Sequence, residues 1–84
     1  MRKKIVAGNW KMNNDLVATN TLISELIKKE KTTNAEVMIA PAFVNLLEAS
    51  KLLKYSSIIV AAQNMHFAEN GAYTGEISAA MLKS

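Results

Sequence analysis

The sequence predicts an α/β fold with parallel strands, from the type and the order of its apolar segments. Continuous apolar runs begin at Ile5 (IVAG), Val37 (VMIA) and Ile58 (IIVAA). None of them alternates apolar with polar residues, which is typical of strands buried on both faces of a parallel sheet. A helical pattern separates each run from the next, so the order is strand, helix, strand, helix, strand. This order predicts two βαβ units with right-handed crossovers.

The first helical pattern lies between the first two apolar runs. Its apolar side is made of Leu22, Ile23, Leu26 and Ile27. Residues four apart fall on one side of a helix, so this side is expected to face the sheet. We expect Asn13 or Asn14 to cap the start of the helix, and Asp15 to lie favourably near the positive end of the helix dipole.

The second helical pattern, between the second and third runs, is shorter. Its apolar side is made of Leu46, Leu47, Leu52 and Leu53. Pro41 comes before it and should end the second strand, because proline has no N–H to donate to a neighbouring strand.

A long polar segment, QNMHFAENGAYTGE, follows the third run, from Gln63 to Glu76. Loops of this length are uncommon in compact domains unless they have a function. The segment EISAAMLKS then opens a helix, for which Thr74 is a candidate cap. The strand that this third crossover helix should lead to is missing. We therefore expect residues 1–84 to form a single, partial domain of a larger α/β protein.

The composition excludes several classes of protein. Half of the 84 residues are hydrophobic and 20% are charged, which is a globular composition. The net charge of +3 comes from dispersed lysines with a single arginine, so no nucleic-acid partner is expected. Without cysteine there is no disulfide or thiol chemistry. The sequence contains neither a secretory signal nor an apolar stretch long enough to span a membrane, so we expect a cytoplasmic protein.

Polar side chains directly after the first strand are the first candidates for chemistry. Ligand sites in parallel α/β folds form at the carboxyl ends of the strands, where Asn9 and Lys11 lie. The Asn9 amide can both donate and accept hydrogen bonds, and the Lys11 ammonium suits a phosphate or a developing oxyanion. The alternative is a surface lysine beside a packing tryptophan, Trp10. Position alone leaves both interpretations open and favours the second.

Other polar residues give weaker signals. Gln63 and Asn64 follow the third strand, at the same end of the predicted sheet as Asn9 and Lys11. They are interpreted as ordinary loop residues. His66 is the only histidine, and a solvated or hydrogen-bonded loop residue is the favoured interpretation. With one histidine, no cysteine and no acidic cluster, no metal site is expected. The glycines of NGAYTG lack the spacing of a phosphate-binding loop.

Taken together, four motifs resemble the triosephosphate isomerase family. They are AGNWKMN after the first strand, AP closing the second, AAQN closing the third, and GAYTGEISAAML after it. The resemblance covers about residues 5–82. It implies the first three strand–helix units of a (β/α)₈ barrel, truncated at the start of the third helix.

The resemblance also implies a reaction and its partners. It implies the interconversion of dihydroxyacetone phosphate and D-glyceraldehyde 3-phosphate, in glycolysis and gluconeogenesis, through an enediolate and without a cofactor. Asn9 and Lys11 would bind the substrate, and Lys11 would also be catalytic. The loop from Gln63 to Glu76 would form a homodimer contact, with Thr74 near the neighbouring subunit's Asn9 and Lys11. Met12 would line the pocket that receives this loop.

Some family features are absent from the sequence. The family is the standard example of a glutamate base paired with a neutral histidine electrophile. Both residues lie further along the family's chain, so His66, Glu69 and Glu76 do not match them. Ala42 stands where the family often has a second proline. The 84 residues alone are therefore expected to be inactive. The alternatives are a non-catalytic natural or engineered piece of the isomerase, or a small flavodoxin-like phosphate-binding module.

Overall fold

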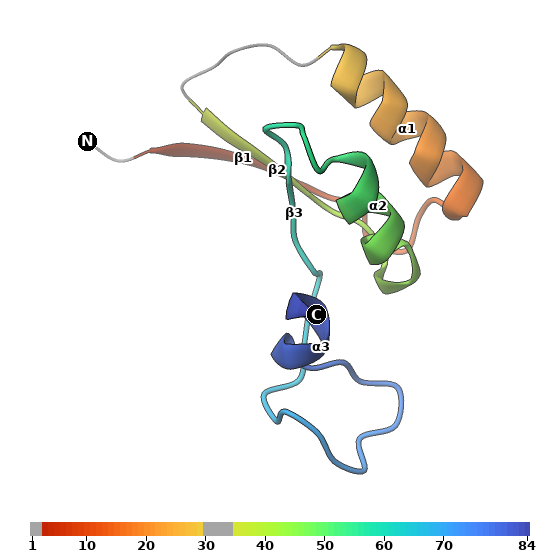
Figure 1. Ribbon diagram of the computed structural model, residues 1–84, viewed down its shortest axis with the longest axis vertical. Coiled ribbons are helices and arrows are strands. Elements are labelled where there is room, and N and C mark those ends of the chain that lie inside the picture. The colour runs from red at the N-terminus through yellow and green to blue at the C-terminus, as the bar shows by residue number, and fades with distance from the viewer. Residues whose placement is uncertain (1–2, 30–34) are drawn as a thin grey trace.

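The fold is a parallel sheet with helices, as the sequence predicts. The computed structural model describes residues 3–29 and 35–84. Within these residues the sheet has three strands, β1 (Lys4–Asn9), β2 (Ala35–Ala40) and β3 (Ile59–Val60), in the order β1-β2-β3 (Figure 1). The register of β1 and β2 runs from Lys4 opposite Ala35 to Asn9 opposite Ala40. The carboxyl ends of the three parallel strands therefore lie at the same end of the sheet, which is called the rim below.

The sequential strand order places both long helices on one side. Right-handed crossovers that always advance to the next strand put every helix on the same face. Accordingly α1 (Leu16–Lys28) and α2 (Leu46–Leu52) pack against each other (Figure 1). The prediction that the strands are buried on both faces is wrong within the described residues. Ile5 and Val6 are each 58% exposed, because the helices cover one face only and β1 is an edge strand.

The cap of helix α1 lies one residue after the two asparagines proposed for that role. The cap is Asp15, whose extended backbone lets its carboxylate accept a hydrogen bond from Ala18 N at 2.9 Å. The prediction of Asn13 or Asn14 is therefore wrong. Asn14 has a φ of +71°, which is incompatible with an extended cap residue. Asn13 instead donates its side-chain amide to Trp10 O at 2.9 Å.

Replacing Asp15 should destabilise the fold measurably. We expect Asp15→Ala to lower the free energy of unfolding by about 1 kcal/mol, the usual cost of losing a cap side chain. Asp15→Asn keeps the accepting oxygen and should retain most of that stability. Urea unfolding of the three proteins measures both values. An Asp15→Asn protein as unstable as Asp15→Ala would contradict the capping role.

Helix α2 follows Pro41 after a short 3₁₀ turn, η1 (Phe43–Asn45). The prediction that the second strand ends before Pro41 is confirmed, because β2 ends at Ala40. The predicted apolar side is only partly correct, since Leu47 is 70% exposed. The buried positions are Ala49 and Leu53, which lie four residues apart and so share one side of the helix.

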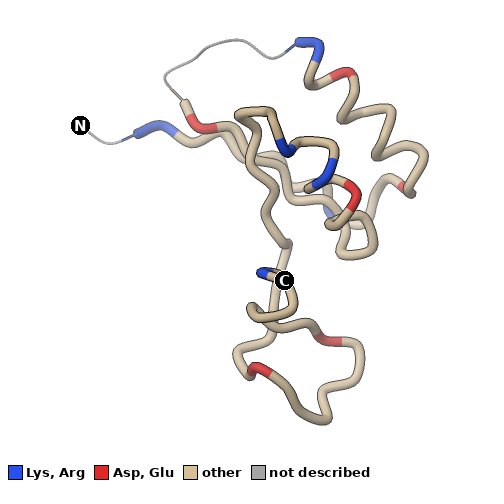
Figure 2. Tube along the Cα trace, viewed as in Figure 1, with Lys and Arg blue, Asp and Glu red and all other residues tan. Residues whose placement is uncertain are grey.

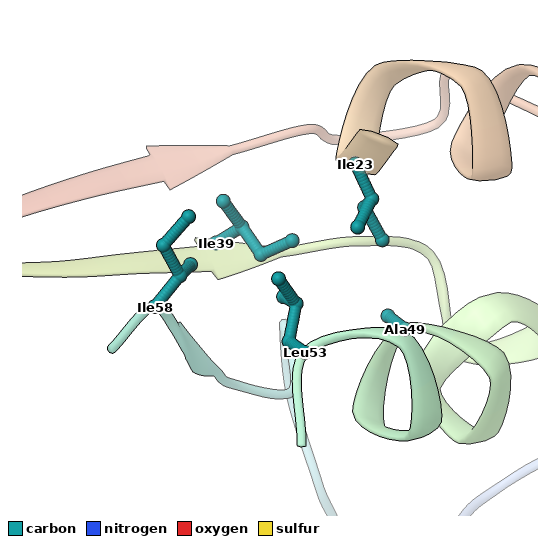
Figure 3. Close-up of a cluster of buried hydrophobic side chains, with 5 residues drawn as sticks. All are labelled: Ile23, Ile39, Ala49, Leu53 and Ile58. Atoms are coloured by element: carbon teal, nitrogen blue, oxygen red, sulfur yellow. The ribbon is translucent and has the colours of Figure 1, made fainter. Parts of the chain in front are cut away.

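A small apolar cluster joins the helices to the sheet (Figure 3). It consists of Ile23, Ile39, Ala49, Leu53 and Ile58. Ile23 comes from α1 and meets the α2 residues across the end of β2. This cluster fixes α1 and α2 over the sheet and thereby sets the course of the loops at the carboxyl ends of the strands.

The segment after β3 runs away from the sheet and returns (Figure 1). Its two ends are tied together, because His66 N donates to Ile77 O at 2.7 Å and His66 forms a bridge with Ser78. Helix α3 (Ala79–Lys83) begins there, and Ser78 caps it by accepting a hydrogen bond from Met81 N. Thr74 lies in a turn before this point, so the prediction that it caps the helix is wrong. No helix in the described part of the chain has the length and apolar character needed to span a membrane.

Candidate functional site

The candidate site lies where the three strands end. Asn9 closes β1 opposite Ala40, the last residue of β2, and Gln63 comes three residues after β3. Gln63 Nε2 donates to two main-chain oxygens, Lys11 O at 2.8 Å and Ala40 O at 2.9 Å. These hydrogen bonds bring Asn9, Lys11 and Gln63, which are far apart in the sequence, to one rim of the sheet.

The main chain at Lys11 has an unusual conformation. Its φ is +54°, a left-handed value that costs a residue with a Cβ atom about 1–2 kcal/mol. The Lys11 N–H donates to Asn9 Oδ1 at 2.9 Å, so the side chain of one candidate residue holds the main chain of the other. Non-glycine residues in this region are concentrated at functional sites, where the surrounding structure maintains the strain.

The polar groups of Asn9 and Lys11 are available to a ligand. Both side chains are exposed. Within residues 3–29 and 35–84, the Lys11 ammonium makes no ion pair and Asn9 Nδ2 donates no hydrogen bond. Figure 2 shows that the other described basic residues lie dispersed along β1, α1, α2 and α3. The rim therefore offers an unpaired cation and, two residues before it, an amide donor, a combination suited to an oxygen-rich anion.

Trp10, between these two residues, packs rather than reacts. Its side chain is half-buried against the apolar cluster, and its main-chain N–H donates to Ala40 O at 3.1 Å. The interpretation of Trp10 as a packing residue is thus confirmed. Anchoring Trp10 in the core fixes the main chain on one side of Lys11.

Comparison with known proteins identifies the family. The family model for triosephosphate isomerase matches residues 4–84. The chain belongs to the triosephosphate isomerase family. It is 62% identical over 85 residues to the triosephosphate isomerase of Flavobacterium psychrophilum, covering 100% of this chain and 34% of that protein. The triosephosphate isomerase of Flavobacterium johnsoniae is 58% identical over 85 residues, with the same coverage. The triosephosphate isomerase of Alkaliphilus metalliredigens is 52% identical over 83 residues, covering 99% of this chain and 34% of that protein.

Two consequences follow for the expectations from sequence. The resemblance to triosephosphate isomerase is confirmed, and the chain spans about a third of the length of the curated relatives it matches. The flavodoxin-like alternative is wrong, because that fold places its first strand between the second and third. Here β2 lies between β1 and β3, in the sequential order of a triosephosphate isomerase barrel.

The two residues expected at a triosephosphate isomerase dimer contact are both exposed in this single chain. Met12 follows Lys11 at the rim and is 94% exposed. Thr74 is also exposed, in the segment that runs away from the sheet (Figure 1). No hydrogen bond joins either side chain to another described residue. Their role in a dimer stays a prediction.

Two side-chain amides that hold main-chain carbonyls were underestimated or missed, and only the first of them lies at the candidate site. Gln63 is not an ordinary loop residue, because it holds the carbonyl of Lys11. Asn45, which was not predicted, is 1% exposed and donates to Asn14 O at 2.9 Å. The available signals were the position of Gln63 at the rim and a polar residue within the apolar stretch after Pro41.

His66 lies in the loop rather than at the rim. Its ring packs between Phe67 and Tyr73, with centroid separations of 4.5 and 4.1 Å, and its Nε2 is buried without a partner. The ring borders a hollow of about 150 Å³ that Glu69 and Glu76 also line. No group of three potential metal ligands occurs among the described residues. His66 is thus a packing element of the loop, and the prediction of a solvated or hydrogen-bonded side chain is wrong at its Nε2.

Proposed function

We propose that this chain is the amino-terminal part of a triosephosphate isomerase that interconverts dihydroxyacetone phosphate and D-glyceraldehyde 3-phosphate. Membership of the family and a length of about a third of its relatives support the proposal. The observation that carries it is the free cation of Lys11, held in a strained main-chain conformation at the carboxyl end of β1.

The proposed complete fold is an eight-unit barrel. Residues 1–84 would supply its first three strand–helix units as one partial domain, up to the start of the third helix. The sequential strands and the exposed apolar side chains of β1 support this arrangement. In a barrel the inner face of the sheet is filled by side chains from the other strands, which would cover Ile5 or Val6.

The proposed chemistry is proton transfer beside a carbonyl. Removing a proton from the carbon next to the carbonyl places negative charge on the oxygen, giving an enediolate. The Lys11 ammonium would stabilise that charge and attract the substrate phosphate, and Asn9 Nδ2 would donate to a substrate oxygen. The reaction is an aldose–ketose isomerisation that needs no cofactor. A base and an electrophile from the rest of the enzyme would complete the site.

We further propose a homodimer in the cytoplasm, acting in glycolysis and gluconeogenesis. The loop from Gln63 to Glu76 would dock against the neighbouring subunit near its Met12, with Thr74 close to that subunit's Asn9 and Lys11. The exposure of Met12 and of the apolar side chains in the loop supports this contact. Each subunit would give its loop and receive the other's, as two-fold symmetry requires.

The proposed function is tested by assaying the complete protein and the 84-residue chain side by side. With glyceraldehyde 3-phosphate as substrate, we expect turnover by the complete protein. We expect none above the uncatalysed rate from residues 1–84, which carry one electrostatic group but neither the base nor the electrophile. An inactive complete protein would favour the non-catalytic alternative. Activity of the short chain would contradict the proposed division of the site.

A further inference from the structure

We propose that Gln63 is a positioning residue that holds the main chain of Lys11, and with it the direction of the Lys11 ammonium. The inference rests on the role proposed above for Lys11. Gln63 itself would touch neither the substrate nor the reacting atoms. It would act by keeping Lys11 in a conformation that the lysine does not favour on its own.

The hydrogen bonds of Gln63 use its amide nitrogen fully. A side-chain amide has two N–H donors, and here one is directed to Lys11 O at 2.8 Å and the other to Ala40 O at 2.9 Å. Ala40 O also accepts from Trp10 N, which a carbonyl with two lone pairs can do. One nitrogen atom therefore links the segment after β3 to the ends of β1 and β2.

This link matters because the conformation of Lys11 is costly. A φ of +54° is disfavoured at a residue with a Cβ, because the Cβ comes too close to the following carbonyl oxygen. The net stabilisation from one hydrogen bond within a protein is of similar size to this strain. Asn9 Oδ1 holds the N–H of Lys11 and Gln63 Nε2 holds its C=O, so two such bonds together balance the strain. Without Gln63 only the bond from Asn9 remains, so the left-handed conformation of Lys11 is favoured less strongly.

The consequence for chemistry comes from the length of the lysine side chain. Rotation about φ at Lys11 changes the direction of its Cα–Cβ bond, and the ammonium lies at the far end of a four-carbon stem. Small rotations of the main chain thus move the charge by ångströms. Misplacing a catalytic group by about 1 Å can reduce the rate about 100-fold.

The first test uses two variants of matched shape in the complete enzyme. Gln63→Met keeps the length of the side chain but removes both donors, and Gln63→Glu keeps the shape but presents a carboxylate to two carbonyl oxygens. We expect each to lower kcat/KM by about 10- to 100-fold, mainly through kcat. If either variant folds and retains the wild-type kcat/KM, the proposal is overturned.

A double-mutant cycle separates positioning from a general structural effect. Residues that act as a unit show non-additive losses. If Gln63 acts through Lys11, then adding Gln63→Met to Lys11→Ala should change kcat/KM by less than about twofold. Losses that multiply in the double variant would show that Gln63 acts elsewhere, and would overturn the proposal.

A spectroscopic test is independent of activity. With ¹³C-labelled lysine, the Cα and Cβ chemical shifts of Lys11 report its left-handed φ. We expect these shifts to move toward ordinary values in Gln63→Met. If they stay unchanged, Gln63 does not hold Lys11, whatever the kinetics show. If they move while Lys11→Ala proves fully active, the positioning stands and the catalytic role proposed for Lys11 fails.

Asn45 provides the matched control. It too donates a side-chain amide hydrogen to the carbonyl of a residue with positive φ, Asn14, at 2.9 Å. Asn45→Leu should lower the melting temperature but leave the Lys11 shifts unchanged and kcat/KM within about twofold of wild type. If Asn45→Leu disturbed Lys11 as much as Gln63→Met does, the effect would be a general loosening of the rim, and the specific role of Gln63 would be refuted.

Discussion

Lys11→Ala in the complete enzyme should lower kcat/KM by about two to three orders of magnitude, the loss expected for one preorganised electrostatic group. The charge is available because no described residue pairs with it. Alanine is the informative replacement, since it keeps a Cβ atom at a φ of +54° and so leaves the main-chain strain in place. The loss in kcat/KM then measures the contribution of the ammonium group and not a relaxation of the main chain.

Two further replacements show which property of Lys11 matters. Lys11→Met keeps most of the length without the charge, and it should be as impaired as Lys11→Ala. Lys11→Arg keeps the charge, but it should restore little activity because the planar guanidinium is larger and directs its donors differently. Steady-state kinetics, with circular dichroism to verify folding, measures all three. A folded Lys11→Ala enzyme with kcat/KM near the wild-type value would make Lys11 an ordinary surface lysine.

The strands and helices could largely be predicted from sequence because their signals are local. The apolar runs at Ile5 and Val37 identify β1 and β2, and Pro41 marks the end of the second strand. The run at Ile58 predicted a longer third strand than the two residues of β3. That strand has a partner on one side only in the described chain, and Ala61 N still donates to Ile39 O at 2.8 Å just beyond it.

The cap of α1 shows where local signals are ambiguous. Asn13, Asn14 and Asp15 all carry an oxygen that can accept from a helix N–H. The choice among them depends on the main-chain path, and the positive φ of Asn14 makes Asp15 the first residue that can be extended. Asn45, which holds Asn14 O, comes from 31 residues later in the chain, so no local pattern could predict it.

The candidate site also combines residues that local sequence signals indicate with contacts between residues far apart in the sequence. Asn9, which ends β1, and Lys11, which follows it, could be selected as candidates from sequence, because ligand sites form at strand ends. The hydrogen bond from Gln63 to Lys11 was not, since it spans 52 residues and depends on the register of the strands. The strain at Lys11 was also hidden, because nothing in the lysine side chain signals a positive φ.

Shortening the loop between Phe67 and Tyr73 should give monomers with impaired activity. Phe67 is 90% exposed in the single chain and Tyr73 is half exposed. Large apolar side chains that are exposed together to water often mark an interaction site. In the proposed dimer these side chains are buried against the neighbouring subunit near Met12. Deleting residues 68–72 removes the segment that presents Phe67 and Tyr73 to the neighbour, and it should keep the hydrogen bond from His66 N to Ile77 O that closes the loop.

The loss of activity should follow from the loss of the neighbour's Thr74. In the proposed dimer this hydroxyl approaches Asn9, whose Oδ1 holds the Lys11 N–H, so a monomer would lose one support of the strained lysine. We expect kcat to fall about 100-fold, the effect of a misplaced catalytic group. Sedimentation velocity and steady-state kinetics measure the two outcomes, with Thr74→Ser as a control that keeps both the dimer and the hydroxyl. A shortened enzyme that stays dimeric, or that becomes monomeric with unchanged kcat, would refute the role of the loop, because the proposal requires assembly and catalysis to be lost together.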